Sequence, residues 1–239
     1  MGGAESRFAY TPSNVPADTV AAPHIKRYPA SVDLRSSLTP HTVRKEHDVS
    51  VALAVVSAFL SECDLNSIDV MVPSVHALSA LTDPNGEGGN IIDAVTALNK
   101  GVPAEDAFND TDDVMDADAY EGDPCNANIT TTALRLKSLD EKSIMSWLAS
   151  QRCVLAVLNV TQDTVEQEEW CTSGDAAGMV AGVIVGYNKY DNAFLFLEAS
   201  VTAAGLLMVP FRDIEFFSEA YVLDVSTVDD GPLFVGASE

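Results

Sequence analysis

Histidine is scarce in this chain of 239 residues, and the few copies lie early in the sequence. They are His24, His41, His47 and His76, so the C-terminal two thirds contain none. Nucleophilic catalysis by serine or cysteine needs a base, most often histidine, beside the nucleophile. A site of that kind would have to take its histidine from the N-terminal third of the chain.

Basic residues are also few. The chain has 13 Lys and Arg against 36 Asp and Glu, a formal net charge of −23. Such a charge repels nucleic-acid phosphates and anionic membrane surfaces, and no stretch resembles a basic patch. We therefore expect no nucleic-acid partner. The composition fits protein partners with basic surfaces, divalent cations or a high-salt environment.

Cysteine pairs and long apolar runs are missing as well. The four cysteines are widely spaced without a CxxC pair, so we expect neither a zinc site, nor a disulfide scaffold, nor any other cofactor. No run reaches the length of about 18 apolar residues that a membrane span needs, and the N-terminus has no apolar h-region. We expect an intracellular protein without a secretory signal, soluble or assembled in a particle such as a virion.

One sequence motif offers a route to a membrane. Residues 1–6 (MGGAES) fit the N-myristoylation pattern, which makes Gly2 a candidate lipidation site. A single acyl chain gives only marginal membrane binding, and no polybasic stretch supplies a second anchor. Membrane contact is expected only if Gly2 is acylated.

Periodicity predicts helices early in the chain and strands later. Residues 1–28 are interrupted by prolines and predict an extended arm that lies on the body or on a neighbour. Helices are predicted at 49–63, at 73–81 and at 91–98. Pro73 is expected in the first turn of the second helix, and Asn90 is expected to cap the third. A fourth helix is predicted to start from a capping box at 138–141 and to run through Ser150. Strands are predicted at 131–136, 153–159, 179–187, 193–198, 204–209 and 221–225. This order is typical of an α+β protein.

Between the two regions lies an acidic segment. Residues 105–123 contain nine Asp and Glu and no basic residue. No window of the segment combines the glycine at the sixth position with the glutamate at the twelfth position that an EF-hand loop needs. We expect a solvated acidic loop, with docking of a partner as the second interpretation.

Three stretches occur in an informative order: residues 29–35 (PASVDLR), 88–102 (GGNIIDAVTALNKGV) and 182–188 (GVIVGYN). Together they resemble the papain-like cysteine peptidases, especially the prodomain-less type of microbes and large DNA viruses. The resemblance covers about residues 29–225. It implies one papain-like domain over 29–239, with a helical half at about 29–124 packed on a barrel-like antiparallel β half at about 125–239.

The positions that match the family's catalytic residues hold other residue types. Val51 stands in place of the nucleophilic cysteine and Val180 in place of the histidine. Lys45 replaces the glutamine that donates to the oxyanion, and Glu198 replaces the asparagine that orients the histidine. Because valine can neither attack a carbonyl nor transfer a proton, the resemblance implies a catalytically dead member without papain-type activity.

Other nucleophiles are weaker candidates. Cys63 follows Glu62, whose charge would raise the pKa of the thiol. Cys153 opens an apolar run that is typical of a buried strand. Ser50 lies beside the vacated position and is expected to cap the first long helix.

The sequence thus predicts a non-catalytic papain-fold protein that acts as a structural or interaction subunit of a larger assembly. By analogy with the viral type, a minor virion protein is the specific expectation. Two alternatives stay open. One is a pseudoenzyme that binds peptide or another ligand in the relict cleft, and the other is a hydrolase with a recruited active site.

Overall fold

The computed structural model describes residues 10–37, 50–83, 89–105, 128–198 and 205–227. The α-helices in these ranges are α1 (Ser50–Leu65), α2 (Val75–Thr82), α3 (Ile91–Lys100), α4 (Glu141–Ala149) and α5 (Gln162–Gln167). The strands are β1 (Thr19–Val20), β2 (Ser31–Asp33), β3 (Ile129–Leu136), β4 (Val154–Thr161), β5 (Ala176–Asn188), β6 (Ala193–Leu197), β7 (Leu206–Pro210) and β8 (Phe217–Thr227).

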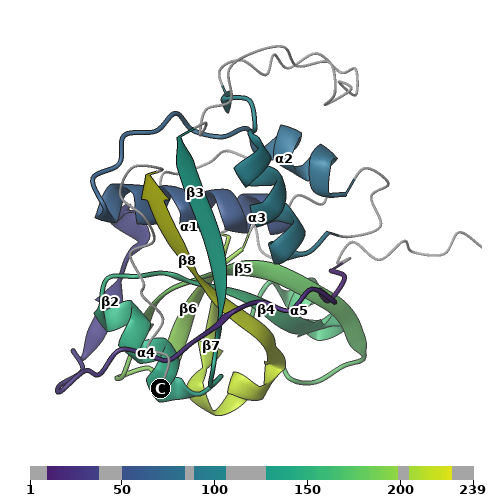
Figure 1. Ribbon diagram of the computed structural model, residues 1–239. Helices are drawn as coiled ribbons and strands as arrows, with labels where there is room; N and C mark the ends of the chain where they lie inside the picture. Colours follow the sequence, from purple (N-terminus) through teal and green to yellow (C-terminus); the bar gives the residue numbers. More distant parts are fainter. Residues whose placement is uncertain (1–9, 38–49, 84–88, 106–127, 199–204, 228–239) are drawn as a thin grey trace, which may run out of the picture.

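Most of the C-terminal half forms one sheet, whose strand order is β1-β3-β8-β4-β5-β6-β7, with β2 beside β5. The pairs are antiparallel except for β1 with β3. Figure 1 shows α1, α2 and α3 together at one end of the molecule and most of the sheet at the other. The predicted α+β arrangement, a helical N-terminal half packed on a β C-terminal half, is confirmed.

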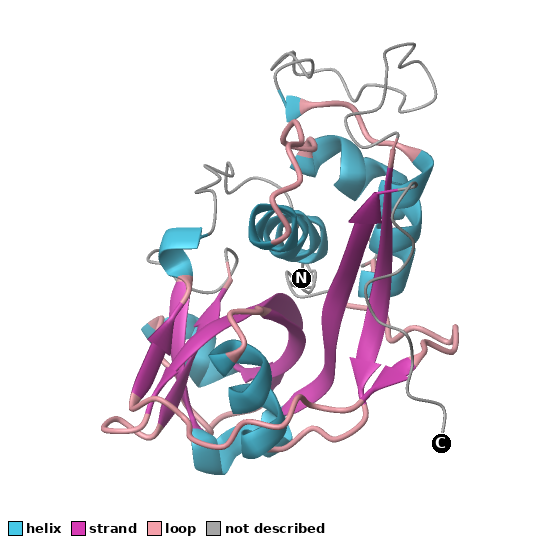
Figure 2. Cartoon of the chain, turned by 60° about the vertical axis from the view of Figure 1, so that its left-hand side comes forward, coloured by secondary structure: helices cyan, strands magenta, loops and turns pink. Residues whose placement is uncertain are grey.

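Helix α1 is the central helix of the molecule. Its sequence SVALAVVSAFLSECDL is apolar nearly all round, as a helix covered on several sides must be, and most of its residues are buried. It packs against β5, β8, α2 and α3, and Figure 2 shows it almost end-on between the two parts of the sheet. The helix predicted at 49–63 is confirmed with its described start at Ser50.

Helix α2 begins two residues later than predicted. The Ser74 side chain accepts a hydrogen bond from the Ala77 N–H and caps the helix, which starts at Val75. Pro73 therefore lies outside the helix, where it forms an isolated bridge with Ala104. The prediction of Pro73 in the first turn was wrong because Ser74 satisfies the helix N-terminus.

Helices α3 and α4 also depend on their caps. Asn90 accepts from the Asp93 N–H at 2.9 Å, so the predicted cap of α3 is confirmed. At α4 the prediction of a capping box from residue 138 was wrong. Asp140 caps this helix, accepting from the Ser143 N–H at 2.9 Å, and Ser138 donates to the Asp140 carboxylate instead.

The strands agree with the predicted ones and are mostly longer. Strand β8 starts at Phe217 rather than at 221, and β5 starts at Ala176 rather than at 179. Residues Ser31–Asp33, placed by sequence in the helical half, form β2 beside β5. Gly186 permits this approach, since a Cβ there would lie 2.2 Å from the Val32 carbonyl oxygen. The short helix α5 was not predicted.

The described part of the N-terminal arm lies on the chain's own body. Strand β1 pairs with the end of β3, and the Arg135 N–H donates to the Asp18 carbonyl at 2.8 Å. Further upstream, the Thr11 N–H donates to the Gly89 carbonyl and Tyr10 is buried. Of the two predicted locations for the arm, body or neighbour, residues 10–28 take the first.

Candidate functional site

Two valines occupy the positions at which the sequence resemblance implies the family's catalytic pair. Val51 is the second residue of α1 and is 6% exposed, and Val180 lies in β5 and is fully buried. Helix α1 packs against β5, and both valines belong to the same hydrophobic core. Neither side chain carries a group that could attack a carbonyl, move a proton or hold a metal ion.

Glu198 follows directly after β6, and the structure buries it to 3% exposure. Its N–H donates to the Gly205 carbonyl oxygen at 3.0 Å, which joins the two described ends of the β6–β7 connection. The remaining vacated position, Lys45, and the candidate lipidation site, Gly2, lie outside the described residues, as does the acidic segment beyond Glu105.

The described thiols are placed as structural cysteines would be. Cys63 and Cys153 are both buried, as the apolar run predicted for Cys153, whereas Cys171 is half-buried. Burial raises the pKa of Cys153 to about 11, an effect that the nearby Glu62 charge adds to and the Ser61 hydroxyl opposes. A thiol with such a pKa is almost wholly protonated at neutral pH and is therefore a poor nucleophile.

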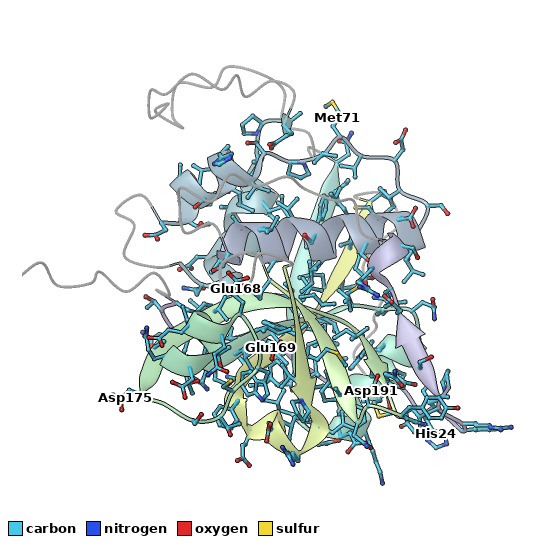
Figure 3. The ribbon with its side chains drawn as sticks, turned by 180° about the vertical axis from the view of Figure 1, so that it is seen from behind. His24, Met71, Glu168, Glu169, Asp175 and Asp191 are labelled. Carbon is cyan, nitrogen blue, oxygen red and sulfur yellow. The ribbon has the colours of Figure 1, made fainter. Side chains whose placement is uncertain are left out.

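The described histidines lie on the N-terminal arm and on α2. His24 is exposed on the arm, as Figure 3 shows, and His76 is half-buried on α2. His41 and His47 lie outside the described residues, as does Cys125. Within the described ranges, no group of three or more His, Cys, Asp or Glu side chains is arranged to hold a metal ion. No helix there is both long and apolar enough to cross a membrane.

A polar cluster that the sequence did not predict lies at the other end of α1. The buried carboxylate of Glu62 is 2.8 Å from Nη1 of Arg152, which precedes β4. Arg152 Nη1 also donates to the Leu223 carbonyl at 3.4 Å, and the buried Asp224 follows on β8. Burial raises the pKa of Glu62 to about 7; Arg152 opposes this rise and the Asp224 charge adds to it.

A second buried carboxylate ties the arm to the sheet. Glu219 on β8 accepts hydrogen bonds from the hydroxyls of Tyr10 at 2.6 Å and Tyr221 at 3.1 Å. Burial and the Glu219 carboxylate raise the pKa of both phenols, that of Tyr221 to about 12. The Tyr10 phenol oxygen also accepts a hydrogen bond from the backbone N–H of Ile91, the first residue of α3. One phenol therefore joins the arm, α3 and β8.

Comparisons with known proteins establish the fold. The chain matches no protein-family profile and no curated protein sequence. It is similar in structure to xylellain, a cysteine protease from Xylella fastidiosa, with a TM-score of 0.73, 19% identity, and coverage of 93% of this chain and 97% of that one. It is also similar to procathepsin L2 from Tenebrio molitor larval midgut, with a TM-score of 0.62, 17% identity and coverage of 91% and 78%.

A third similar structure is procathepsin B S9 from Trypanosoma congolense, with a TM-score of 0.63, 14% identity and coverage of 96% and 88%. The chain therefore has the fold of the papain-like cysteine proteases, as its sequence motifs predicted. Identities this low establish the fold alone. What the protein does must be argued from its own residues, because enzymes and non-enzymes can share one fold.

Proposed function

We propose that this chain is a non-catalytic papain-fold protein that serves as a structural or interaction subunit of a larger assembly. The observation that carries the proposal is the pair Val51 and Val180. Both valines are buried apolar side chains at the matched nucleophile and base positions. A papain-type reaction needs a thiolate to attack the carbonyl and an imidazole to exchange its proton, and valine supplies neither function.

The remaining side chains support this interpretation. Cys153, the first residue of the apolar run, is buried directly before the core strand β4, and burial raises its pKa to about 11. A hydrolase with a recruited site would need an accessible, ionised nucleophile, and burial opposes both requirements for this thiol. A ligand-binding pseudoenzyme would need polar groups directed into the relict cleft, and the two valines supply none.

The excess of acidic residues indicates which kind of partner the chain would bind. With 36 acidic and 13 basic residues, the chain is suited to proteins with basic surfaces, and the acidic segment at 105–123 is the proposed docking element. Nucleic acid is not a proposed partner, and a membrane becomes one only through acylation of Gly2. A minor virion component is the particular assembly that we propose, on the sequence resemblance alone.

The test is to isolate the native protein from its source and measure its size and co-purifying partners. The proposal expects stable incorporation in a particle or a multi-subunit complex. A free monomer would contradict it, and a monomer that holds a small molecule would favour the ligand-binding alternative. Truncation of the whole arm is a poor test, because residues 10–28 include β1 and the buried Tyr10 and their removal would damage the fold itself.

Charge substitution tests the docking element without that difficulty. The variant Asp112→Asn/Asp113→Asn/Asp116→Asn/Asp118→Asn removes four charges from the acidic segment. A matched control removes four exposed charges elsewhere, Glu141→Gln/Glu166→Gln/Glu169→Gln/Glu215→Gln. We expect the first variant to lose the partner and the second to retain it. Equal retention by both would contradict the docking role, and equal loss would show that only total charge matters.

A further inference from the structure

The fold gathers basic side chains that are separated in the sequence. Residues 19–32 contain no acidic residue, although acids outnumber bases almost threefold in the whole chain. This stretch carries the exposed side chains of His24, Lys26 and Arg27. The β5–β6 turn brings a fourth, Lys189, to the same place. We refer to His24, Lys26, Arg27 and Lys189 as the basic turn.

Hydrogen bonds hold the two parts of the basic turn together. The Lys189 N–H donates to the Ala30 carbonyl at 3.0 Å, and its ammonium donates to the Tyr28 carbonyl at 3.2 Å. The same ammonium lies 5.4 Å from the centre of the Tyr28 ring, a cation–π distance. Tyr187, at the end of β5, donates its hydroxyl to the Pro29 carbonyl at 3.2 Å. The backbone at residues 28–30, directly after Lys26 and Arg27, is thus held against β5 and the β5–β6 turn.

The other side of Tyr28 is held as well. Its hydroxyl lies 2.8 Å from the hydroxyl of Ser146 on α4, which itself donates to the Lys142 carbonyl. A binding surface that is ordered in advance does not pay the entropy of ordering when it meets a partner. Tyr28 and Lys189 are therefore ordered parts of this surface, and Arg27 directly precedes the ordered Tyr28.

The charges of the basic turn are available to a partner. Within the described residues, the short-range ion pairs of basic groups are Arg35–Asp33, Arg152–Glu62 and Arg212–Asp213, and none involves Lys26, Arg27 or Lys189. The one acid of the β5–β6 turn itself, Asp191, accepts a hydrogen bond from the Asn188 side chain. Figure 3 shows His24 and Asp191 at one edge of the molecule, with His24 pointing outward.

An exposed aromatic ring follows Lys189 in the chain. Tyr190 follows Lys189 in the turn and is 82% exposed, the most exposed of the large apolar or aromatic side chains in the described ranges. Tyrosine and arginine are enriched where protein surfaces bind partners, because both combine a flat contact face with hydrogen-bonding groups. An aromatic ring beside cations suits a partner that carries carboxylates interspersed with apolar groups.

We propose that the basic turn, with Tyr190, binds a short acidic peptide segment of a partner protein. This surface takes partners of the opposite charge from those in the proposed function, and the inference stands whether or not the chain is an enzyme. At physiological ionic strength the Debye length is about 8 Å, so a short segment responds to the local cations rather than to the net charge of −23.

The size of the partner distinguishes an acidic peptide from the other anionic partners, nucleic acids and lipid surfaces. A nucleic acid or a lipid surface is extended, so it would bring phosphates against the acidic surroundings as well as against the basic turn. A short peptide can contact the cations and the Tyr190 ring alone. The observations therefore favour a peptide.

The experiment measures fluorescence anisotropy of a rhodamine-labelled peptide of alternating glutamate and alanine, titrated with the full chain. The matched glutamine–alanine peptide is the neutral control. We expect the acidic peptide to bind and the neutral one not to bind. The variant Lys26→Ala/Arg27→Ala should weaken binding about three- to tenfold, since each exposed charge pair contributes modestly.

The control variant Lys100→Ala/Arg212→Ala removes two exposed cations from other surfaces and should leave the dissociation constant unchanged. Tyr190→Ala should also weaken binding, without a change in the urea midpoint. Absence of binding, or equal weakening in both charge variants, would overturn the proposal. Tighter binding of a single-stranded oligonucleotide or of phosphatidylserine vesicles, lost in Lys26→Ala/Arg27→Ala, would overturn the assignment to a peptide.

Discussion

Glu62 on α1 and Arg152 before β4 form an ion pair of 2.8 Å between side chains that are 2% and 13% exposed. The pair connects the central helix with the sheet, and Asp224 on β8 places a second carboxylate in the same buried region. A buried ion pair is weak evidence for stability, because both charges lose their hydration. The buried Glu62 carboxylate instead makes the free energy of unfolding sensitive to pH.

The first prediction concerns that sensitivity. Burial raises the pKa of Glu62 from 4.5 to about 7, so the folded chain holds this proton more tightly than the unfolded chain does. The resulting stabilisation is complete below pH 4.5 and is lost as pH rises through 7. The free energy of unfolding of the wild type, relative to Glu62→Gln, should fall by about 2 kcal/mol between about pH 5 and pH 8.

Urea unfolding of both proteins at the two pH values provides the measurement. Glu141→Gln, an exposed change on α4, is the control and should show no comparable trend. A difference between wild type and Glu62→Gln that is constant with pH would show that Glu62 does not titrate in this range.

The second prediction concerns the partner. Arg152→Leu leaves the Glu62 carboxylate buried without its counter-ion, so it should lower the free energy of unfolding at about pH 8 by about 3–5 kcal/mol. The loss should be smaller at about pH 5, because a protonated Glu62 needs no counter-ion. The double variant Glu62→Leu/Arg152→Leu should recover much of the loss in a double-mutant cycle. Additive losses from the two substitutions would contradict the pairing.

The third prediction concerns the arm. Tyr10→Phe removes the hydroxyl that donates to Glu219 at 2.6 Å, and the carboxylate stays buried with Tyr221 as its phenol donor. The expected cost is about 1–3 kcal/mol of the free energy of unfolding, measured in urea at neutral pH. Tyr190→Phe is the matched control, since that ring is 82% exposed, and it should cost almost nothing. Equal stability of the two variants would show that Tyr10 does not anchor the arm.

Local sequence patterns predicted the start of a helix correctly where a single residue could serve as its N-cap. Asn90 has the side chain and the position to accept from Asp93, and α3 begins there. At α4 two candidate caps lie two residues apart, and the residue pattern favoured Ser138 although Asp140 makes the bond. The order of motifs at 29–35, 88–102 and 182–188 predicted the papain-like fold because each motif fits one element of that fold.

Contacts between distant residues could not be predicted in the same way. Tyr10 and Glu219 are 209 residues apart in the sequence and meet only because the arm returns to β8. The Glu62–Arg152 pair likewise needs α1 to lie against the sheet. The sequence showed no basic patch because Lys189 is remote from Lys26 and Arg27 until the β5–β6 turn reaches the arm. Such arrangements follow from the tertiary fold rather than from local periodicity.

Above all, we propose that Val51 and Val180 leave the chain without papain-type catalysis. The most direct measurement treats the purified full chain with a thiol-directed peptidase probe and with an unstructured protein substrate, beside an active papain-like peptidase. We predict neither probe labelling of the native chain nor cleavage of the substrate. Because Cys171 is half-buried, a Cys171→Ser variant serves as the control for unspecific alkylation. Native-state labelling that disappears in Cys63→Ala, together with substrate cleavage, would contradict the account.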